Sequence, residues 1–186
     1  MNTFKTHIIS LKKDFERKSW MRNVMRQTLL EFEFIDALEP NDVSIDIKQQ
    51  LFKNVDFFEW KINHDAVIAT FLSHMSELIY AYENQQNLLI LEDDIVYVRP
   101  FLFSNVNFEE FDLFNIGAEF GCYAYFVSWQ GAGRILQHIT SIEITQAYDW
   151  ELFKIHHLRI KKVDQPVFIQ TDKFKSNIAP NGYEKY

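Results

Sequence analysis

Apolar residues along the chain follow two patterns, one typical of strands and the other of helices. Strands are predicted at six short apolar runs, which cover residues 7–11, 32–37, 88–91, 112–116, 122–127 and 160–163. Apolar residues spaced three, four and seven apart predict helices over 14–34, 64–85, 128–136 and 147–153. Because strands and helices alternate, we expect an α/β fold with a mostly parallel central sheet flanked by helices.

The remaining segments lack a clear period. Residues 43–63 are charged and irregular, and 101–111 are expected to form a loop or a short helix. The tail over 165–186 contains two prolines and a glycine and is expected to be largely irregular. Since no repeat or linker interrupts the chain, a single domain over 1–186 is predicted.

The composition is that of a protein with a buried hydrophobic core, and it argues against nucleic-acid binding and against a disulfide within the chain. The 186 residues are 47% hydrophobic and include 18 phenylalanines, so a sizeable core can be buried. Lysine and arginine number 19 against 26 acidic residues, and this net charge of −7 argues against a nucleic-acid partner. Cys122 is the only cysteine in the sequence, which excludes a disulfide within the chain.

The N-terminal region carries a charge opposite to that of the whole chain. Residues 1–30 contain seven lysines and arginines against two acidic residues, and no apolar run has the length of a signal or membrane-spanning segment. We therefore expect a cytoplasmic protein, with any membrane contact peripheral and at the inner face of the cytoplasmic membrane. The basic residues either solvate a helix face or converge on an anion at a strand–loop–helix unit.

The strongest chemical signal is the triplet Glu92, Asp93 and Asp94, directly after the buried strand 88–91. Three adjacent carboxylates repel one another, and a hard divalent cation such as Mg²⁺ or Mn²⁺ would stabilise them. In open α/β sheets ligands bind beyond the carboxyl ends of the strands, where this triplet is expected. The alternative is an acidic turn in solvent.

Two further residues are candidates for proton transfer. His74 lies on the predicted helix 64–85 among apolar residues, and its alternative role is that of a buried core histidine. Asp149 stands between Tyr148 and Trp150, and aromatic surroundings suit a carboxylate to general-base catalysis. Its alternative role is to cap the short helix 147–153.

Several of these motifs occur together, in the same order, in a known family. They are Ile8–Lys13 with Glu16–Lys18, Phe34–Ala37, Leu72–His74, Ile90–Asp94, Ala124–Ser128 followed by Ala132 and Leu136, and the single positions Asp149, Gln170 and Ser176. In these segments the chain resembles glycosyltransferase family 25, whose bacterial members build lipooligosaccharide.

The resemblance implies a GT-A-like nucleotide-sugar transferase fold. It also implies inverting transfer of a hexose, most often galactose from UDP-galactose, to a lipooligosaccharide or other glycan acceptor. It assigns Glu92 and Asp94 to a Mn²⁺ or Mg²⁺ ion and Asp149 to the general base, with His74 as second choice for the base. Donor binding falls to Ser10, Leu11, Lys12, Arg17, Asp36 and Asp93, and Tyr125 and Trp150 are candidate platforms for a sugar ring.

One stretch departs from the family pattern. The family usually has Gly-Glu-x-Gly-Cys just before Leu-Ser-His, where this chain has Ala66–Thr70. A carboxylate and two glycines are therefore missing from a region expected to line the donor pocket. The missing stretch favours a non-catalytic relative that binds a nucleotide sugar, whereas the intact triplet Glu92–Asp94 disfavours it. A second alternative is an unrelated metal-dependent phosphohydrolase that uses the same triplet.

Overall fold

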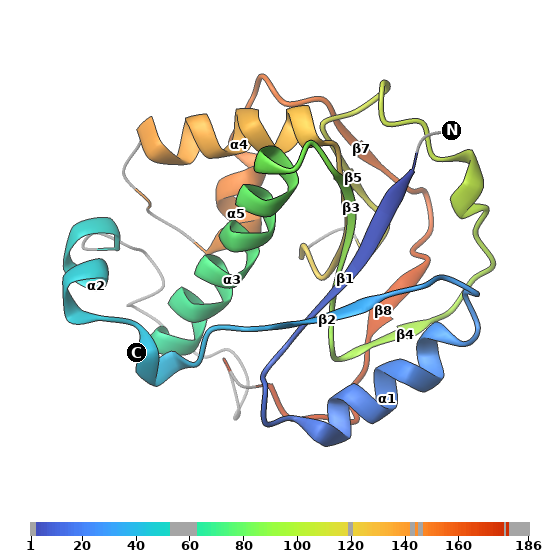
Figure 1. Cartoon of the computed structure of the whole chain (residues 1–186), viewed down its shortest axis with the longest axis horizontal. Coiled ribbons are helices and arrows are strands. Elements are labelled where there is room, and N and C mark those ends of the chain that lie inside the picture. Colours follow the sequence, from blue (N-terminus) through green and yellow to red (C-terminus); the bar gives the residue numbers. More distant parts are fainter. Residues whose placement is uncertain are drawn as a thin grey trace.

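The structure is a computed structural model that describes residues 3–52, 63–118, 121–141, 144, 147–176 and 178, except for the side chains of Trp150 and Phe153 (Figure 1). The strands are β1 (Phe4–Ser10), β2 (Glu33–Asp36), β3 (Asn87–Glu92), β4 (Ile95–Tyr97), β5 (Leu113–Asn115), β6 (Ala124–Val127), β7 (Ile160–Lys162) and β8 (Phe168–Gln170). The helices are α1 (Phe15–Met25), α2 (Ile45–Leu51), α3 (His64–Glu83), α4 (Trp129–Ser141) and α5 (Tyr148–Phe153), with 3₁₀ turns η1 (Pro40–Asp42) and η3 (Phe103–Asn105).

A six-stranded sheet in the order β2–β1–β3–β6–β5–β7 forms the centre of the fold. β1 pairs in parallel with β2 and β3, and β5 pairs in parallel with β7, whereas β6 is antiparallel to both of its neighbours. The predicted α/β class with a mostly parallel sheet is therefore confirmed. Ile9 lies opposite Glu92 in the register, so β1 and β3 end at the same edge of the sheet.

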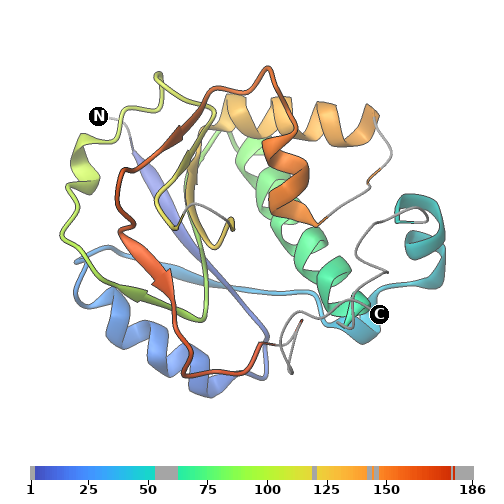
Figure 2. The same ribbon diagram turned by 180° about the vertical axis from the view of Figure 1, so that it is seen from behind.

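The two faces of the sheet bury different cores. Leu88 and Ile90 point toward the face covered by α3, α4 and α5, whereas Leu89 and Leu91 point toward α1, η3 and the β4–β8 pair. This alternation follows from the two-residue period of a strand. On the second face several phenylalanine rings gather around Phe126. Figure 2 shows the backbone from behind, with α1 in blue and β8 as an orange-red arrow. The sheet thus holds β3 between two packed layers.

Two predicted helices start where the structure has them, although α4 runs on to Ser141, beyond the predicted end at 136. α3 runs from His64 to Glu83, close to the predicted 64–85. α4 starts after Ser128, whose hydroxyl accepts a hydrogen bond from the Gly131 amide at 3.0 Å, as expected of an N-cap. In the described ranges, no helix combines the length and the apolarity that crossing a bilayer requires.

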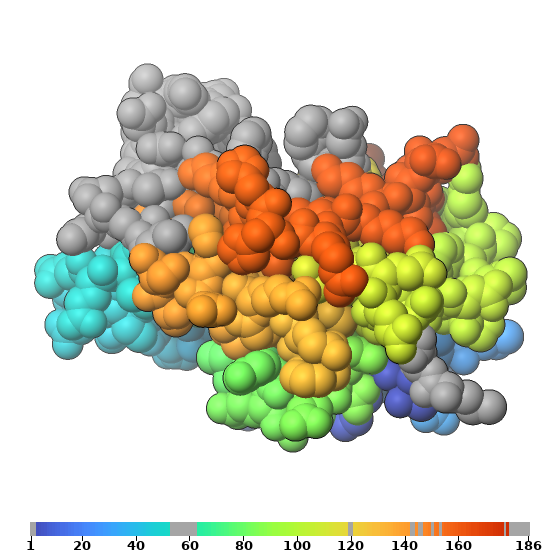
Figure 3. Space-filling model, turned by 90° about the horizontal axis from the view of Figure 1, so that it is seen from above, coloured from blue at the N-terminus to red at the C-terminus, as the bar shows by residue number. Residues whose placement is uncertain are grey.

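Two predictions about secondary structure were wrong. The helix predicted over 14–34 ends at Met25, because the following residues form a turn in which Leu29 has a φ of 59°. The segment 43–63 contains α2, which has no buried residue and lies at one edge of the molecule (cyan in Figure 3). The described part of the tail over 165–186 is largely irregular, as predicted, although it includes β8, and its last residues lie outside the described ranges. A single domain over 1–186 stays a prediction.

Candidate functional site

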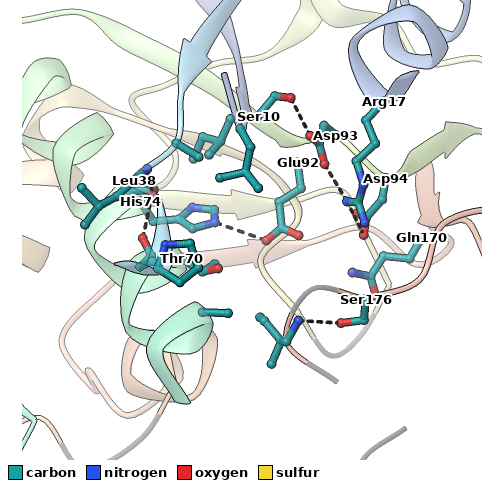
Figure 4. A pocket seen from close by; sticks show the side chains of 18 residues that line it. Ser10, Arg17, Leu38, Thr70, His74, Glu92, Asp93, Asp94, Gln170 and Ser176 are labelled. Carbon is teal, nitrogen blue, oxygen red and sulfur yellow. Dashed lines mark hydrogen bonds and ion pairs between the residues drawn. The ribbon is translucent and has the colours of Figure 1, made fainter. Parts of the chain in front are cut away.

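A pocket opens where β1 and β3 end, at the carboxyl edge of the sheet (Figure 4). The acidic triplet follows β3 at its base, the amino-terminal half of α3 forms one wall, and residues of the C-terminal segment face the triplet from the other side. The lining residues are Ile9, Ser10, Leu11, Arg17, Ala37, Leu38, Pro40, Ala66, Ala69, Thr70, Ser73, His74, Glu92, Asp93, Asp94, Gln170, Ser176 and Ile178.

Arg17 is the cation that contacts this triplet most directly. Its Nη1 donates to Asp93 Oδ1 at 2.8 Å and lies 3.4 Å from Asp94 Oδ2. Its Nε lies 3.3 Å from Asp14, the residue that caps the start of α1, and its Nη2 donates to the Lys175 carbonyl at 2.8 Å. Ser10 donates to the other Asp93 oxygen at 2.6 Å. The Asp93 carboxylate is therefore held by hydrogen bonds from β1 and from α1.

Burial and mutual repulsion perturb the carboxylates. Burial raises the pKa of Glu92 to about 8, with a further contribution from the charges of Asp93 and Asp149. Burial likewise raises the pKa of Asp94 to about 7, assisted by Glu92 and opposed by Arg17. Burial works against the charge on Arg17, but the Asp93 hydrogen bond and the charges around it raise the pKa of its guanidinium. The site therefore gathers more carboxyl groups than its arginine alone can keep ionised near neutral pH.

The oxygens of the triplet suit a divalent cation. Asp94 Oδ1 is buried and has no hydrogen-bond partner among the described residues. Mg²⁺ in particular is usually held by one or two carboxylates together with substrate phosphates and water. The described ranges contain no group of three or more His, Cys, Asp or Glu side chains arranged to hold a metal alone. Glu92 and Asp94 therefore fit an ion that is shared with a phosphate-bearing ligand.

His74 approaches the triplet from α3. Its Nε2 lies 3.2 Å from Glu92 Oε1, and its Nδ1 lies 2.9 Å from the hydroxyl of Tyr125 on β6. The imidazole is 1% exposed, and burial lowers its pKa to about 4, against the charges of Asp149 and Glu77. Both ring nitrogens are engaged in this structure, which favours a positioning role over that of a free base.

The remaining predicted residues fall around the pocket or behind it. Lys12 and Asp36 do not line it, although each adjoins a residue that does, and Asp36 lies 3.4 Å from the Lys18 ammonium. Asp149 is in the first turn of α5, where its charge acts on Glu92 and His74. Tyr125 is wholly buried, so the expectation that its ring supports a sugar was wrong. The Trp150 side chain lies outside the described part.

Two contributors were missed by sequence reasoning. Asp14 pairs with Arg17, and the three-residue spacing between a helix cap and a basic residue was a signal for this contact. Tyr148 donates to or accepts from Tyr125 at 2.9 Å, and no sequence pattern indicated that these two hydroxyls meet. Gln170 and Ser176, noted in the sequence as polar positions, do line the pocket.

The fold is similar to that of a solved glycosyltransferase. The crystal structure of a glycosyltransferase involved in the glycosylation of the major capsid of PBCV-1 matches with a TM-score of 0.53, covering 92% of this chain and 95% of that one. At 10% identity this similarity concerns the fold alone. A sequence profile of glycosyltransferase family 25 (LPS biosynthesis protein) matches residues 3–115, more than half of the chain. The chain belongs to glycosyltransferase family 25. A comparison with curated proteins yields no match.

Proposed function

We propose that this protein transfers a hexose from a nucleotide sugar to a lipooligosaccharide or related glycan acceptor, with inversion and with the help of Mn²⁺ or Mg²⁺. UDP-galactose is the first donor to test, and the fold is proposed to be of the GT-A kind. The observation that carries this proposal is the triplet Glu92–Asp94 at the base of a pocket, with an unpartnered buried oxygen on Asp94.

The donor is proposed to lie along the carboxyl edge of β1 and β3. Glu92 and Asp94 would hold the cation, which supplies positive charge to the diphosphate as it leaves. Arg17 is placed to add charge on the same side, and Asp93, fixed by Ser10 and Arg17, can accept hydrogen bonds from ribose or sugar hydroxyls. Leu11 lines the pocket directly, whereas Lys12 and Asp36 would act from its rim.

Inversion requires a base on the side of the sugar opposite the diphosphate. The acceptor oxygen forms its bond to the anomeric carbon as the bond from that carbon to the phosphate oxygen breaks, and the base takes the acceptor proton. We propose Asp149 for this step, because its charge reaches Glu92 and His74 from the first turn of α5. His74 is second choice, since both of its nitrogens already have partners.

The test of this proposal is the Asp94→Asn variant, with Asp164→Asn as its control because Asp164 is exposed and does not line the pocket. Turnover of UDP-galactose with Mn²⁺ should fall by about 10²- to 10³-fold in Asp94→Asn, as when one electrostatic group is lost from an active site. Asp164→Asn should match the wild type. Full Mn²⁺-dependent activity in Asp94→Asn would dismiss the triplet as the cation site.

A second candidate function is binding of a nucleotide sugar without turnover. It is favoured by one observation, since Ala66 and Ala69 line the pocket at the two positions where the family usually carries glycine. Calorimetric binding of UDP-sugars with Mn²⁺, combined with an absence of turnover across donors and acceptors, would favour this reading. No observation of the described residues adds support for a phosphohydrolase.

The proposed acceptor also indicates where in the cell the protein would act. A lipid-linked glycan would bring the enzyme to an anionic membrane surface, and the pocket lies beside the basic N-terminal region. Phe15, in the first turn of α1, is 76% exposed near Lys12 and Lys13. We propose peripheral contact at the inner face of the cytoplasmic membrane through this end of α1.

A further inference from the structure

Four side chains form a hydrogen-bonded row that ends at the pocket. The hydroxyls of Tyr148 and Tyr125 are 2.9 Å apart, the Tyr125 hydroxyl is 2.9 Å from His74 Nδ1, and His74 Nε2 is 3.2 Å from Glu92 Oε1. These residues come from α5, β6, α3 and β3, so the row crosses the core beneath the pocket. Figure 4 shows its last link, with His74 and Glu92 pointing toward one another.

The row is shielded from water and its imidazole is held flat. Tyr148, Tyr125 and His74 are 5%, 0% and 1% exposed. The His74 ring stacks on Tyr148 with centroids 4.5 Å apart and planes at 18°, and on Tyr125 at 5.8 Å and 26°. A buried polar atom without a hydrogen-bond partner is energetically costly, so each imidazole nitrogen is expected to keep the partner it has here. Its two contacts therefore fix its orientation.

The direction of each hydrogen bond follows from the end of the row. A carboxylate that binds a cation is deprotonated and can only accept hydrogen bonds. His74 must then donate from Nε2, and a neutral imidazole has a single N–H, so its Nδ1 accepts. The Tyr125 hydroxyl supplies that hydrogen, and its oxygen is left to accept from Tyr148. All three hydrogens in the row are thus assigned.

We infer that Tyr125 and Tyr148 are positioning residues, which select the tautomer of His74 that donates to Glu92 and so orient this carboxylate toward the cation. This inference rests on the proposed function, because it takes Glu92 as a cation ligand. A histidine that donates to a ligand is the usual second layer of support for a bound metal, and its own partner is what sets its tautomer.

The experiment measures binding of Mn²⁺ to the full chain by titration calorimetry, for the wild type and two variants, with UDP present at a fixed concentration because the ion is expected to be shared with a phosphate-bearing ligand. Tyr125→Phe removes the hydrogen donated to His74 Nδ1, and the Mn²⁺ affinity should fall about 10-fold, the lower end of losses from supporting residues. Tyr148→Phe leaves Tyr125 free to donate and should cost less than about 3-fold. At saturating Mn²⁺ both should approach the wild-type kcat, since only the hold on the cation is weakened.

A matched control is Tyr97→Phe, whose hydroxyl accepts a hydrogen bond from the Phe101 amide at 2.9 Å outside the row. It loses one hydroxyl as the other variants do, and its Mn²⁺ affinity should not change. A second measurement reads the tautomer directly: in ¹⁵N NMR spectra of histidine-labelled protein loaded with diamagnetic Mg²⁺ and UDP, His74 should carry its proton on Nε2, and Tyr125→Phe should lose this preference. A purely structural role would lower the melting temperature without moving either readout.

The outcomes separate the inference from the proposed function. If the wild type binds Mn²⁺ and folded Tyr125→Phe binds it equally well, the positioning role is overturned while the proposed function stands. If the wild type binds no Mn²⁺, the cation is wrong and the inference falls with it. Should Tyr125→Phe fail to fold, Tyr148→Phe and the His74 tautomer of the wild type decide, and a proton on Nδ1 overturns the inference.

Discussion

Replacing Arg17 with methionine is expected to destabilise the fold strongly, because the substitution leaves buried carboxylates without their cation. The Arg17 side chain is 8% exposed, and it contacts Asp93 at 2.8 Å and Asp94 at 3.4 Å, which are 11% and 16% exposed. Removing one partner of a buried ion pair costs about 3–5 kcal/mol. Since Asp94 can take up a proton instead, we expect the lower end, about 3 kcal/mol at pH 8.

The loss should depend on pH in a defined direction. Arg17 lowers the pKa values of Glu92 and Asp94, which burial has raised to about 8 and about 7, so its removal raises them further. A carboxyl group whose folded pKa lies above its unfolded value binds more protons when folded, and stability then falls as the pH rises between the two values. The difference between wild type and Arg17→Met should therefore grow from pH 5 to pH 8.

Urea denaturation at several pH values measures this difference as a free energy of unfolding. Arg26→Met is the control, because Arg26 is exposed at the C-cap of α1, the opposite end of the helix from Arg17, and its guanidinium donates to the exposed Asn23 side chain at 3.0 Å. It should change stability by less than about 1 kcal/mol. A loss below about 1 kcal/mol for Arg17→Met at pH 8, or one independent of pH, would refute the reasoning.

Two other predictions concern packing and location. In Gly131→Ala the new methyl group would overlap the backbone carbonyl of Asp112, so thermal unfolding should show a loss of stability of about 2 kcal/mol or more. The control is Gly133→Ala, whose methyl group meets only the ring of Tyr82. This ring is 51% exposed and can turn aside, so the stability of the control should stay within about 1 kcal/mol of the wild type. The protein should float with anionic vesicles at low salt and remain at the bottom of the gradient at high salt, and Phe15→Ser should weaken flotation. Equal flotation with neutral and anionic vesicles would contradict peripheral contact at the start of α1.

Long periodic segments and buried runs were predictable from the sequence, whereas short pairings were not. α3 and β3 have repeated apolar positions, so their existence and class follow from pattern alone. β4 and β8 have only three residues each, and they become strands because they pair with one another across a long stretch of chain. The end of α1 depends on Leu29 in a left-handed conformation, which leucine rarely adopts and composition does not reveal.

The site was predictable where residues follow a strand and unpredictable where they meet across the core. Glu92, Asp93 and Asp94 had to reach the carboxyl edge of the sheet once β3 was recognised. The role of Tyr125 did not follow in this way, because all four residues of β6 are buried and give no alternation from which to assign a face. His74 reaches the Tyr125 hydroxyl only because α3 packs on the face of the sheet to which Tyr125 points.

The bond from Arg17 to the Lys175 carbonyl joins positions 158 residues apart, while Ser10 and Asp93 are separated by 83. During synthesis the amino-terminal strand and helix leave the ribosome long before the segment that closes this edge of the pocket. A nascent chain that has folded only as far as β3 would expose its acidic edge with one side open. Completion of the pocket therefore waits until translation has passed Lys175, long after β1 and α1 have been made.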